Sequence, residues 1–158
     1  MPRFNGPFVA TFNYPATNKV VSFMEHVIVQ MTLTMILDPG QVAYNYNSAS
    51  HDNPGPKRGD ISVTLTSPGG TKSTLLPLRP LDYINTDGYG DPWPFMSVHY
   101  WGESPVGEWS LNVAFASSGA SVSVSKLSMQ VYGTTATPLA VSRIPASCDP
   151  ACARGCAA

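Results

Sequence analysis

The chain has 158 residues and a net charge of −1; 12% of its residues are charged, 43% are apolar and 10% are aromatic. The charged fraction is about half the roughly 25% of an ordinary soluble domain, and the near-zero net charge without a basic run argues against a nucleic-acid binder. The aromatic content argues against disorder, and no run approaches the length of a membrane span. The length predicts a single domain.

The first part of the chain contains one clear strand. Residues 1–23 show no clear hydrophobic period and lack the apolar core of a signal peptide, so we expect a leader or an irregular segment. Residues 25–37 alternate apolar and polar side chains, which predicts a half-buried strand. Residues 38–59 contain Pro-Gly turn signals and predict a loop.

A hairpin is expected next. Apolar residues alternate with Ser and Thr over residues 61–66, and the pattern resumes over residues 71–76 after Ser67-Pro68-Gly69-Gly70. A gap of this size between two strands is typical of a β-hairpin. Residues 77–92 predict a polar loop.

Two further strands contain many of the aromatic residues. Residues 93–101 are dense in aromatic side chains and predict a strand, and residues 109–115 predict another. Pro92 and Pro94 confine the start of the first to a sheet edge or a strand beginning, because proline cannot donate to a ladder.

The last strand changes phase. Its apolar side chains lie on even positions up to Val124 and on odd positions from Leu127 onward. Because a shift of one residue exchanges the two faces, a bulge near Ser125-Lys126 is expected. Residues 135–147 predict a linker. Six or seven short strands and no helical stretch predict an all-β fold, an antiparallel β-sandwich.

The cysteines gather at one end, at Cys148, Cys152 and Cys156. Their spacing matches neither a zinc C-x2-C pair nor a redox C-x-x-C motif. An odd number in so short a segment predicts that residues 148–158 are the truncated start of a cysteine-rich module, and that the chain is a piece of a secreted protein. Three free thiols in a cytosolic protein are the alternative.

The sequence does not favour a hydrolase. His26, His51 and His99, with several Asp and Ser residues, allow a triad to be drawn. However, Ser67-Pro68-Gly69-Gly70 is not the G-x-S-x-G nucleophile motif, and we expect no catalytic residue in this chain.

Arg58-Gly59-Asp60 spells a tripeptide that some adhesion receptors bind. The structural interpretation is that Gly59 permits the turn into the strand at Ile61, while the neighbouring charges bond backbone groups. An independent adhesion or lectin-like β-sandwich is the alternative function.

Three carboxylates of the polar loop are weak calcium candidates. Asp82, Asp87 and Asp91 carry suitable oxygens, but they do not fit the EF-hand pattern. Asp87-Gly88 is equally well explained as a turn.

The aromatic residues are candidates for the core and for an interface. Most are expected inside, because aromatic side chains dominate sandwich interiors. Strand alternation places Trp93 and Phe95 on one face and Tyr100 on the other, so we expect that not all of these side chains are buried in one core and that those left outside form a contact with a partner domain. The full candidate set is Trp93, Phe95, Tyr100, Trp101 and Trp109.

A series of stretches carries a family resemblance: Lys57-Arg58-Gly59-Asp60-Ile61, Ser67-Pro68-Gly69-Gly70-Thr71-Lys72-Ser73-Thr74-Leu75-Leu76, Arg79-Pro80, Asp87-Gly88-Tyr89, Trp93-Pro94-Phe95-Met96-Ser97-Val98-His99-Tyr100-Trp101-Gly102-Glu103 and Gly107-Glu108-Trp109. Over residues 24–134 the chain closely resembles the P domain (P/Homo B domain) of furin- and kexin-like proprotein convertases. Residues 148–156 look like the opening of a furin-type cysteine-rich repeat. Residues 1–23 match poorly, Pro92 looks like an insertion, and the catalytic domain is absent.

The resemblance implies a jelly-roll-like β-sandwich that is not itself catalytic. It implies a partner in cis, a subtilisin-like catalytic domain that needs the P domain for stability and whose calcium and pH dependence the P domain tunes. The parent enzymes would be calcium-dependent serine endoproteases that cut precursors at basic sites in the secretory pathway. No cofactor is implied for this chain, and the calcium would be held by the parent catalytic domain.

Overall fold

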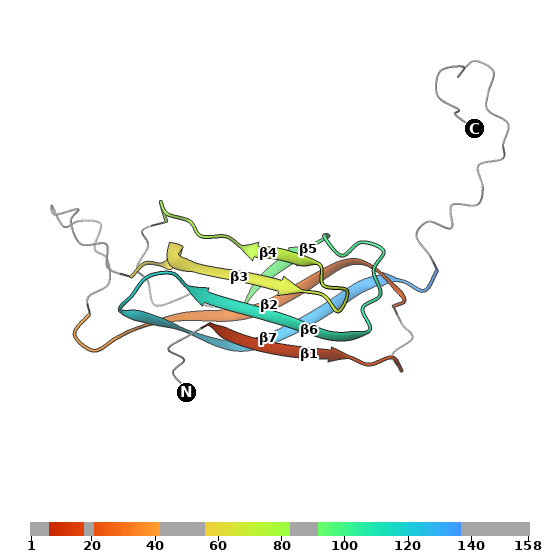
Figure 1. Ribbon diagram of the computed structural model, residues 1–158, viewed down its shortest axis with the longest axis horizontal. Helices are drawn as coiled ribbons and strands as arrows, with labels where there is room; N and C mark the ends of the chain where they lie inside the picture. Colours follow the sequence, from red (N-terminus) through yellow and green to blue (C-terminus); the bar gives the residue numbers. More distant parts are fainter. Residues whose placement is uncertain (1–6, 18–20, 42–55, 83–91, 137–158) are drawn as a thin grey trace, which may run out of the picture.

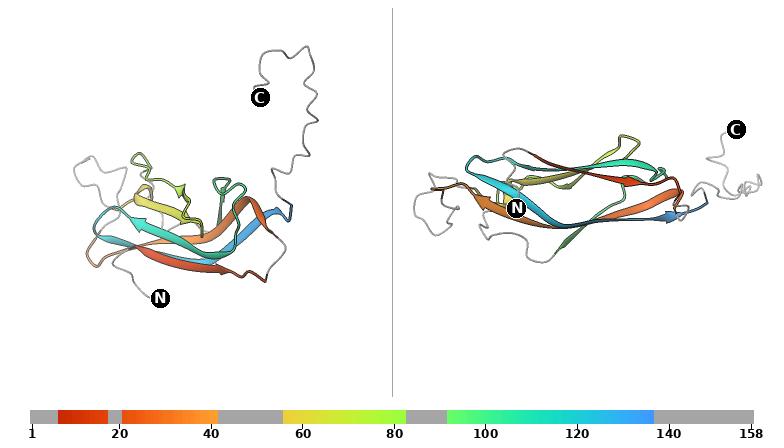
Figure 2. Two further views of the ribbon diagram at one scale, coloured as in Figure 1. Left: turned by 45° about the vertical axis from the view of Figure 1, so that its right-hand side comes forward. Right: turned by 90° about the horizontal axis from the view of Figure 1, so that it is seen from below.

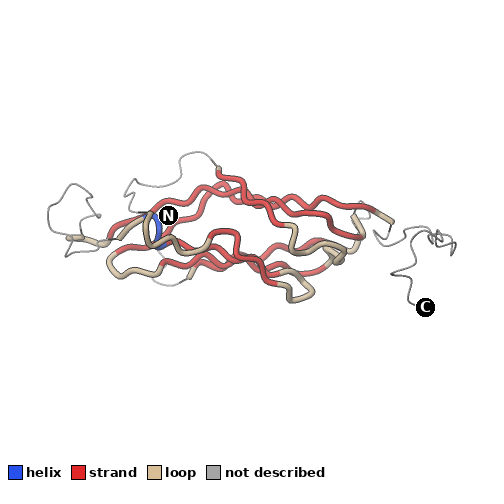
Figure 3. The backbone as a smooth tube through the Cα atoms, turned by 90° about the horizontal axis from the view of Figure 1, so that it is seen from above, coloured by secondary structure: helices blue, strands red, loops and turns tan. Residues whose placement is uncertain are grey.

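The computed structural model describes residues 7–17, 21–41, 56–82 and 92–136. These residues form two antiparallel sheets packed face to face, with strand orders β1-β6-β3-β4 and β5-β2-β7 (Figures 1 and 3). The all-β sandwich expected from the strand patterns is confirmed. The strands are β1 (Phe8–Tyr14), β2 (Phe23–Leu37), β3 (Ile61–Thr66), β4 (Lys72–Leu76), β5 (Trp93–Ser97), β6 (Gly107–Phe115) and β7 (Ala120–Thr134).

The core lies between the two sheets and follows from the alternation within the strands. Successive side chains of a strand point to opposite faces, so every second residue of the central strands enters the interior. Burial of these side chains is the main force that holds the sheets together. The fully buried side chains of β2, β3 and β6 are Met24, Val27, Val29, Met31, Leu33, Ile61, Val63, Leu65, Trp109, Leu111 and Val113.

The predicted hairpin joins β3 to β4. Thr66 pairs with Lys72, and the Gly70 N–H donates to the Ser67 carbonyl at 2.9 Å. Gly70 has a φ of +88°, a conformation that glycine adopts without steric cost. The turn signals in the sequence therefore located both strands.

The predicted bulge in β7 is also present. Gln30 pairs with Ser128 and Thr32 with Ser125, so two residues of β7 lie opposite one residue of β2. The first of the two, Lys126, has a φ of +49°. The bulge moves the buried face of β7 from even to odd positions, which explains the phase change in the sequence.

Strand β5 lies at the edge of its sheet, as its prolines require. Pro94 stands opposite Gln30 of β2. The strand ends at Ser97, four residues earlier than the sequence pattern predicts. The chain then turns, with the Trp101 N–H donating to the Val98 carbonyl at 3.2 Å.

The interpretation of residues 1–23 as leader or irregular segment is wrong for Phe8–Tyr14. They form β1, which pairs with β6 from Phe8↔Val113 to Tyr14↔Gly107. The pattern is weak because β1 is an edge strand whose inward side chains are only half buried, and its pairing partner lies about a hundred residues away along the chain.

Strands β2 and β7 are the longest of the fold and run side by side (Figure 2). They begin and end the region of resemblance. The three cysteines, and the linker from residue 137 onward, lie outside the described residues. Within the described ranges, no helix is long and apolar enough to cross a membrane.

Candidate functional site

The tripeptide Arg58-Gly59-Asp60 forms one turn of 3-10 helix directly before β3. The Gly59 N–H donates to the Asp82 carbonyl at 3.2 Å, and the Gly59 carbonyl accepts from the Arg79 N–H at 2.8 Å. A Cβ on Gly59 would lie 2.1 Å from the Arg79 carbonyl oxygen. Glycine is therefore required here by the close approach of another backbone segment, and not by an unusual φ.

The charged side chains of the tripeptide are engaged within the domain. The Arg58 guanidinium donates two hydrogen bonds of 3.1 Å to the two carboxylate oxygens of Asp82, the bidentate geometry that makes such pairs strong. The Asp60 carboxylate accepts from the Lys57 N–H at 3.2 Å and from the Ser117 hydroxyl. This arrangement leaves little of the tripeptide for a receptor.

Of the three calcium candidates, the structure describes Asp82, which lies beside the tripeptide. Asp82 is bound by two guanidinium groups, with Arg79 Nε at 3.2 Å and Arg58 Nε at 3.1 Å. Asp87 and Asp91 lie outside the described residues. Among the residues that the structure describes, no three His, Cys, Asp or Glu side chains gather closely enough to hold a metal ion.

Two of the three histidines fall within the described residues. His26 stacks on Tyr132 with ring centroids 4.5 Å apart, and His99 lies in the turn after β5. His51 lies outside the described residues.

The aromatic residues divide between core and surface. Phe95, Tyr100 and Trp109 are buried, whereas Trp93 is 40% exposed and Trp101 is 60% exposed. The prediction from strand alternation that Tyr100 and Phe95 lie on opposite faces is wrong, because both side chains are buried. Because β5 ends at Ser97, alternation no longer applies at Tyr100, and the turn directs its ring into the interior.

Tyr100 joins the two sheets. Its hydroxyl donates to the Leu65 carbonyl of β3 at 2.8 Å, and its ring meets that of Trp109 edge-on with centroids 5.0 Å apart. Burial, assisted by the nearby Glu103 carboxylate, raises the pKa of Tyr100 to about 12. The residue is a structural tyrosine that remains neutral at physiological pH.

The outward side of the β5-β2-β7 sheet carries exposed and half-buried side chains that the strand register brings together. Met96 is 66% exposed and lies opposite the half-buried Ile28, and the stacked pair His26 and Tyr132 lies further along the same face. The turn that directly follows β5 carries two more exposed side chains, Val98 and Trp101, which we group with this face. We call this set the outer apolar face: His26, Ile28, Met96, Val98, Trp101 and Tyr132.

Of the residues on this face, only Trp101 was predicted from the sequence as an interface candidate. The missing members follow from the register of three strands, since Met96 and Tyr132 come together only once β5 and β7 flank β2. One local signal was present in β5, where Met96 alternates with the buried Phe95 and Ser97. An exposed apolar group of this kind usually marks a contact surface.

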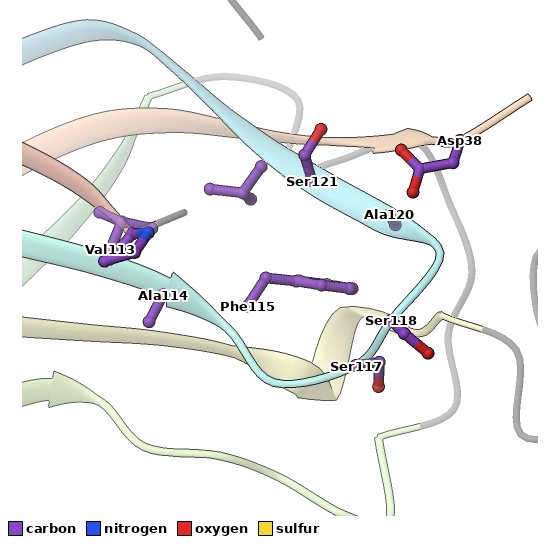
Figure 4. A pocket seen from close by; sticks show the side chains of 10 residues that line it. Asp38, Val113, Ala114, Phe115, Ser117, Ser118, Ala120 and Ser121 are labelled. Carbon is purple, nitrogen blue, oxygen red and sulfur yellow. The ribbon is translucent and has the colours of Figure 1, made fainter. Parts of the chain in front are cut away.

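A cavity of about 320 Å³ lies at the end of the sandwich where β6 turns into β7 (Figure 4). Its described lining offers hydroxyl groups of Ser117, Ser118 and Ser121 and the carboxylate of Asp38. These groups can hydrogen-bond to a polar molecule. Ser117 is already engaged by Asp60, so part of the lining serves the turn before β3.

Known proteins match large parts of this chain. The sequence model of the proprotein convertase P-domain matches residues 48–131. Furin of Rattus norvegicus is 35% identical over 129 residues, which cover 81% of this chain and 14% of that protein. Proprotein convertase subtilisin/kexin type 4 of Homo sapiens is 53% identical over 57 residues, which cover 36% of this chain and 7% of that protein.

A crystal structure of a serine protease of Aeromonas sobria is similar at 22% identity with a TM-score of 0.48, over 83% of this chain and 21% of that chain. The chain thus spans a small part of the length of the relatives that it matches. The sequence motifs of residues 57–109 and the family match over more than half of the chain lead to one conclusion. The chain belongs to the proprotein convertase P-domain family.

Proposed function

We propose that this P domain is a non-catalytic accessory domain that stabilises a subtilisin-like serine endoprotease domain of the same polypeptide. Membership of the P-domain family supports the proposal that the parent protein is a convertase. The observation that supports the mode of action is the outer apolar face, where Met96, Val98 and Trp101 are 54–66% exposed. A domain that exposes such side chains gains stability when a partner covers them.

The P domain would stabilise the catalytic domain through the burial of apolar surface between the two domains. Apolar surface removed from water contributes roughly 25 cal/mol per Å². A partner that binds only the native state of the catalytic domain shifts its folding equilibrium toward that state. The outer apolar face would then act as the P domain's half of a shared interface.

The proposed docking would also affect how the parent enzyme responds to pH and calcium. A catalytic domain stabilised in this way tolerates conditions that weaken it, such as acidic pH or low calcium, so docking tunes both dependences. The calcium would be bound by the catalytic domain. The parent enzyme would process precursors at basic sites in the secretory pathway.

The test uses a polypeptide that joins a convertase catalytic domain to this chain. Met96→Lys and Val98→Lys place a charge on the outer apolar face, and Val9→Lys is the matched control because Val9 is 56% exposed on the other sheet. We expect the two face variants to lower the thermal midpoint of the catalytic domain and its hydrolysis of basic-site peptides. The control should leave both unchanged, and the P domain alone should hydrolyse nothing.

Equal thermal midpoints for the face variants and for Val9→Lys would contradict docking through this face. Circular dichroism of the isolated variants shows that the P domain itself remains folded. A lysine at these exposed positions leaves the core of the sandwich unchanged.

A further inference from the structure

Lys57 and Arg58 are the only adjacent basic residues in the sequence. Residues 79–82, which we call the clasp, lie directly against them. We propose that the Arg58–Gly59 peptide bond is a latent proteolytic site, open to proteases that recognise basic residues once the clasp is released. This inference does not depend on the proposed function.

The first feature that closes the site is the backbone conformation. A protease binds its substrate as an extended strand, with main-chain hydrogen bonds on either side of the bond to be cut. Here Arg58–Asp60 form a 3-10 turn, and both backbone polar groups of Gly59 are bonded to the clasp, at 3.2 Å to Asp82 and 2.8 Å to Arg79. The segment cannot extend until these two hydrogen bonds break.

The second feature is the engagement of the basic side chains. A trypsin-like protease must place the basic side chain in an acidic pocket. The Arg58 guanidinium is held bidentately by Asp82, and the Lys57 ammonium donates to the Pro80 carbonyl at 2.9 Å. The clasp also contacts the carbonyl of the bond itself, because Arg79 Nη2 donates to the Arg58 carbonyl at 3.1 Å.

The clasp is held by polar contacts and contributes no core side chain. Leu81 is 82% exposed, and Leu78 next to the clasp is 50% exposed. A segment with few buried apolar contacts opens locally at a lower free energy than the whole domain. The clasp can therefore open while the sheets remain folded, which distinguishes this bond from peptide bonds within strands.

The reaction is an ordinary hydrolysis. Water adds across the bond between the Arg58 carbonyl carbon and the Gly59 nitrogen, leaving a carboxylate on Arg58 and an ammonium on Gly59. Strands β1 and β2 precede the cut, and their partners β6 and β7 follow it. Since both pairings cross the cut, the two pieces stay associated in a nicked domain.

The experiment is limited trypsin digestion of the folded chain, followed by mass spectrometry of the fragments. Asp82→Ala removes the carboxylate that holds Arg58, and Glu108→Ala is the matched control, an exposed carboxylate on β6. We expect Asp82→Ala to raise the rate of cleavage after Arg58 by about tenfold or more, since local opening sets that rate. The control should match the natural chain.

Cleavage after Lys72 supplies an internal reference. Lys72 lies in β4, so its cleavage reports unfolding of the sheet. Opening of the clasp raises cleavage after Arg58 and leaves cleavage after Lys72 unchanged. A parallel rise at both positions would overturn the proposal, as would a folded Asp82→Ala chain that is cut after Arg58 no faster than the natural chain.

A second variant and a second measurement cover the case in which Asp82→Ala fails to fold. Arg79→Gln removes the hydrogen bonds from Arg79 to Asp82 and to the Arg58 carbonyl and should give the same selective cleavage. In the natural chain, hydrogen exchange of the Gly59 amide should proceed by local opening, with a rate that low concentrations of denaturant do not change. Exchange of the Gly59 amide only through global unfolding would overturn the proposal that the clasp opens locally.

Discussion

Tyr100 illustrates how a single residue can hold the two sheets of the sandwich in place. It belongs to the turn after β5, yet its hydroxyl reaches the Leu65 carbonyl of β3 in the opposite sheet. A buried hydroxyl that lost this acceptor would carry the full cost of its desolvation. The hydrogen bond and the edge-on contact with Trp109 therefore fix the path of the turn.

The raised pKa of Tyr100 predicts a loss of stability in alkali. The pKa is about 12 in the folded protein and 10.0 in its ordinary state. The neutral phenol is thus favoured by folding, and its contribution is fully present below pH 10 and is lost as the pH rises to about 12. Denaturant unfolding between pH 9 and pH 12 should show this decline.

The control for this prediction is Tyr132→Phe, because Tyr132 is 41% exposed. Tyr100→Phe should be less stable than the natural chain at pH 8 by about 1 kcal/mol, the usual contribution of one hydrogen bond, and its stability should decline less in alkali. An identical alkaline decline in Tyr100→Phe and in Tyr132→Phe would contradict the assignment.

At the scale of elements, the bulge of β7 has an unusual occupant. The first residue of a bulge with positive φ is ordinarily glycine, but here it is Lys126 at +49°. A side chain with a Cβ in this left-handed region carries steric strain. The side chain is exposed, so nothing in the core compensates for the strain.

Lys126→Gly should therefore stabilise the domain. Relief of the left-handed strain raises the free energy of unfolding, and the greater conformational entropy of glycine in the unfolded chain offsets part of this gain. The net increase should be about 0.5 to 1 kcal/mol. Ser128→Gly is the control, an exposed position of the same strand without positive φ, and it should destabilise. Urea unfolding of both variants measures the effect, and a loss of stability in Lys126→Gly would show that the bulge is not strained.

The elements also show what the sequence alone could predict. The bulge and the β3–β4 hairpin were predictable because phase and turn residues are local signals. Strand β1 was not, because edge burial weakens its alternation and its register is set by the distant β6. The same holds for the contacts of Arg58, whose partner Asp82 lies 24 residues away, and for the outer apolar face, which exists only once three strands pair.

At the scale of the whole molecule, the hydrogen bonds of the carboxylates predict how calcium affects the stability of the domain. Asp60 and Asp82 are bound by donors of the protein itself, and the Glu103 carboxylate accepts from the hydroxyls of Ser67 and Thr71. Carboxylates engaged in this way serve the fold, because each satisfies donors of turns that would otherwise lose their partners. They stabilise the domain whether or not calcium is present.

Removal of calcium should accordingly leave the isolated domain unchanged. We expect its thermal midpoint in excess EDTA to agree within about 1 °C with that in millimolar calcium, since only a ligand that binds the native state raises stability. The same comparison on a polypeptide that includes a convertase catalytic domain should show a clear dependence. A midpoint of the isolated domain that rises by several degrees with calcium would instead indicate a site in this chain, with Asp87 and Asp91 as the residues to mutate.

The pairings of β1 with β6 and of β2 with β7 have a consequence for biosynthesis. Phe8 pairs with Val113 and Phe23 with Thr134, so each sheet joins segments made early to segments made about a hundred residues later. Loop closure over such distances makes folding slow, on the order of milliseconds to seconds for β-sandwiches. The first sheet cannot be completed until β6 has left the ribosome, and the second not until β7 has. Until then the apolar side chains of β2 depend on chaperones or on a neighbouring domain for cover.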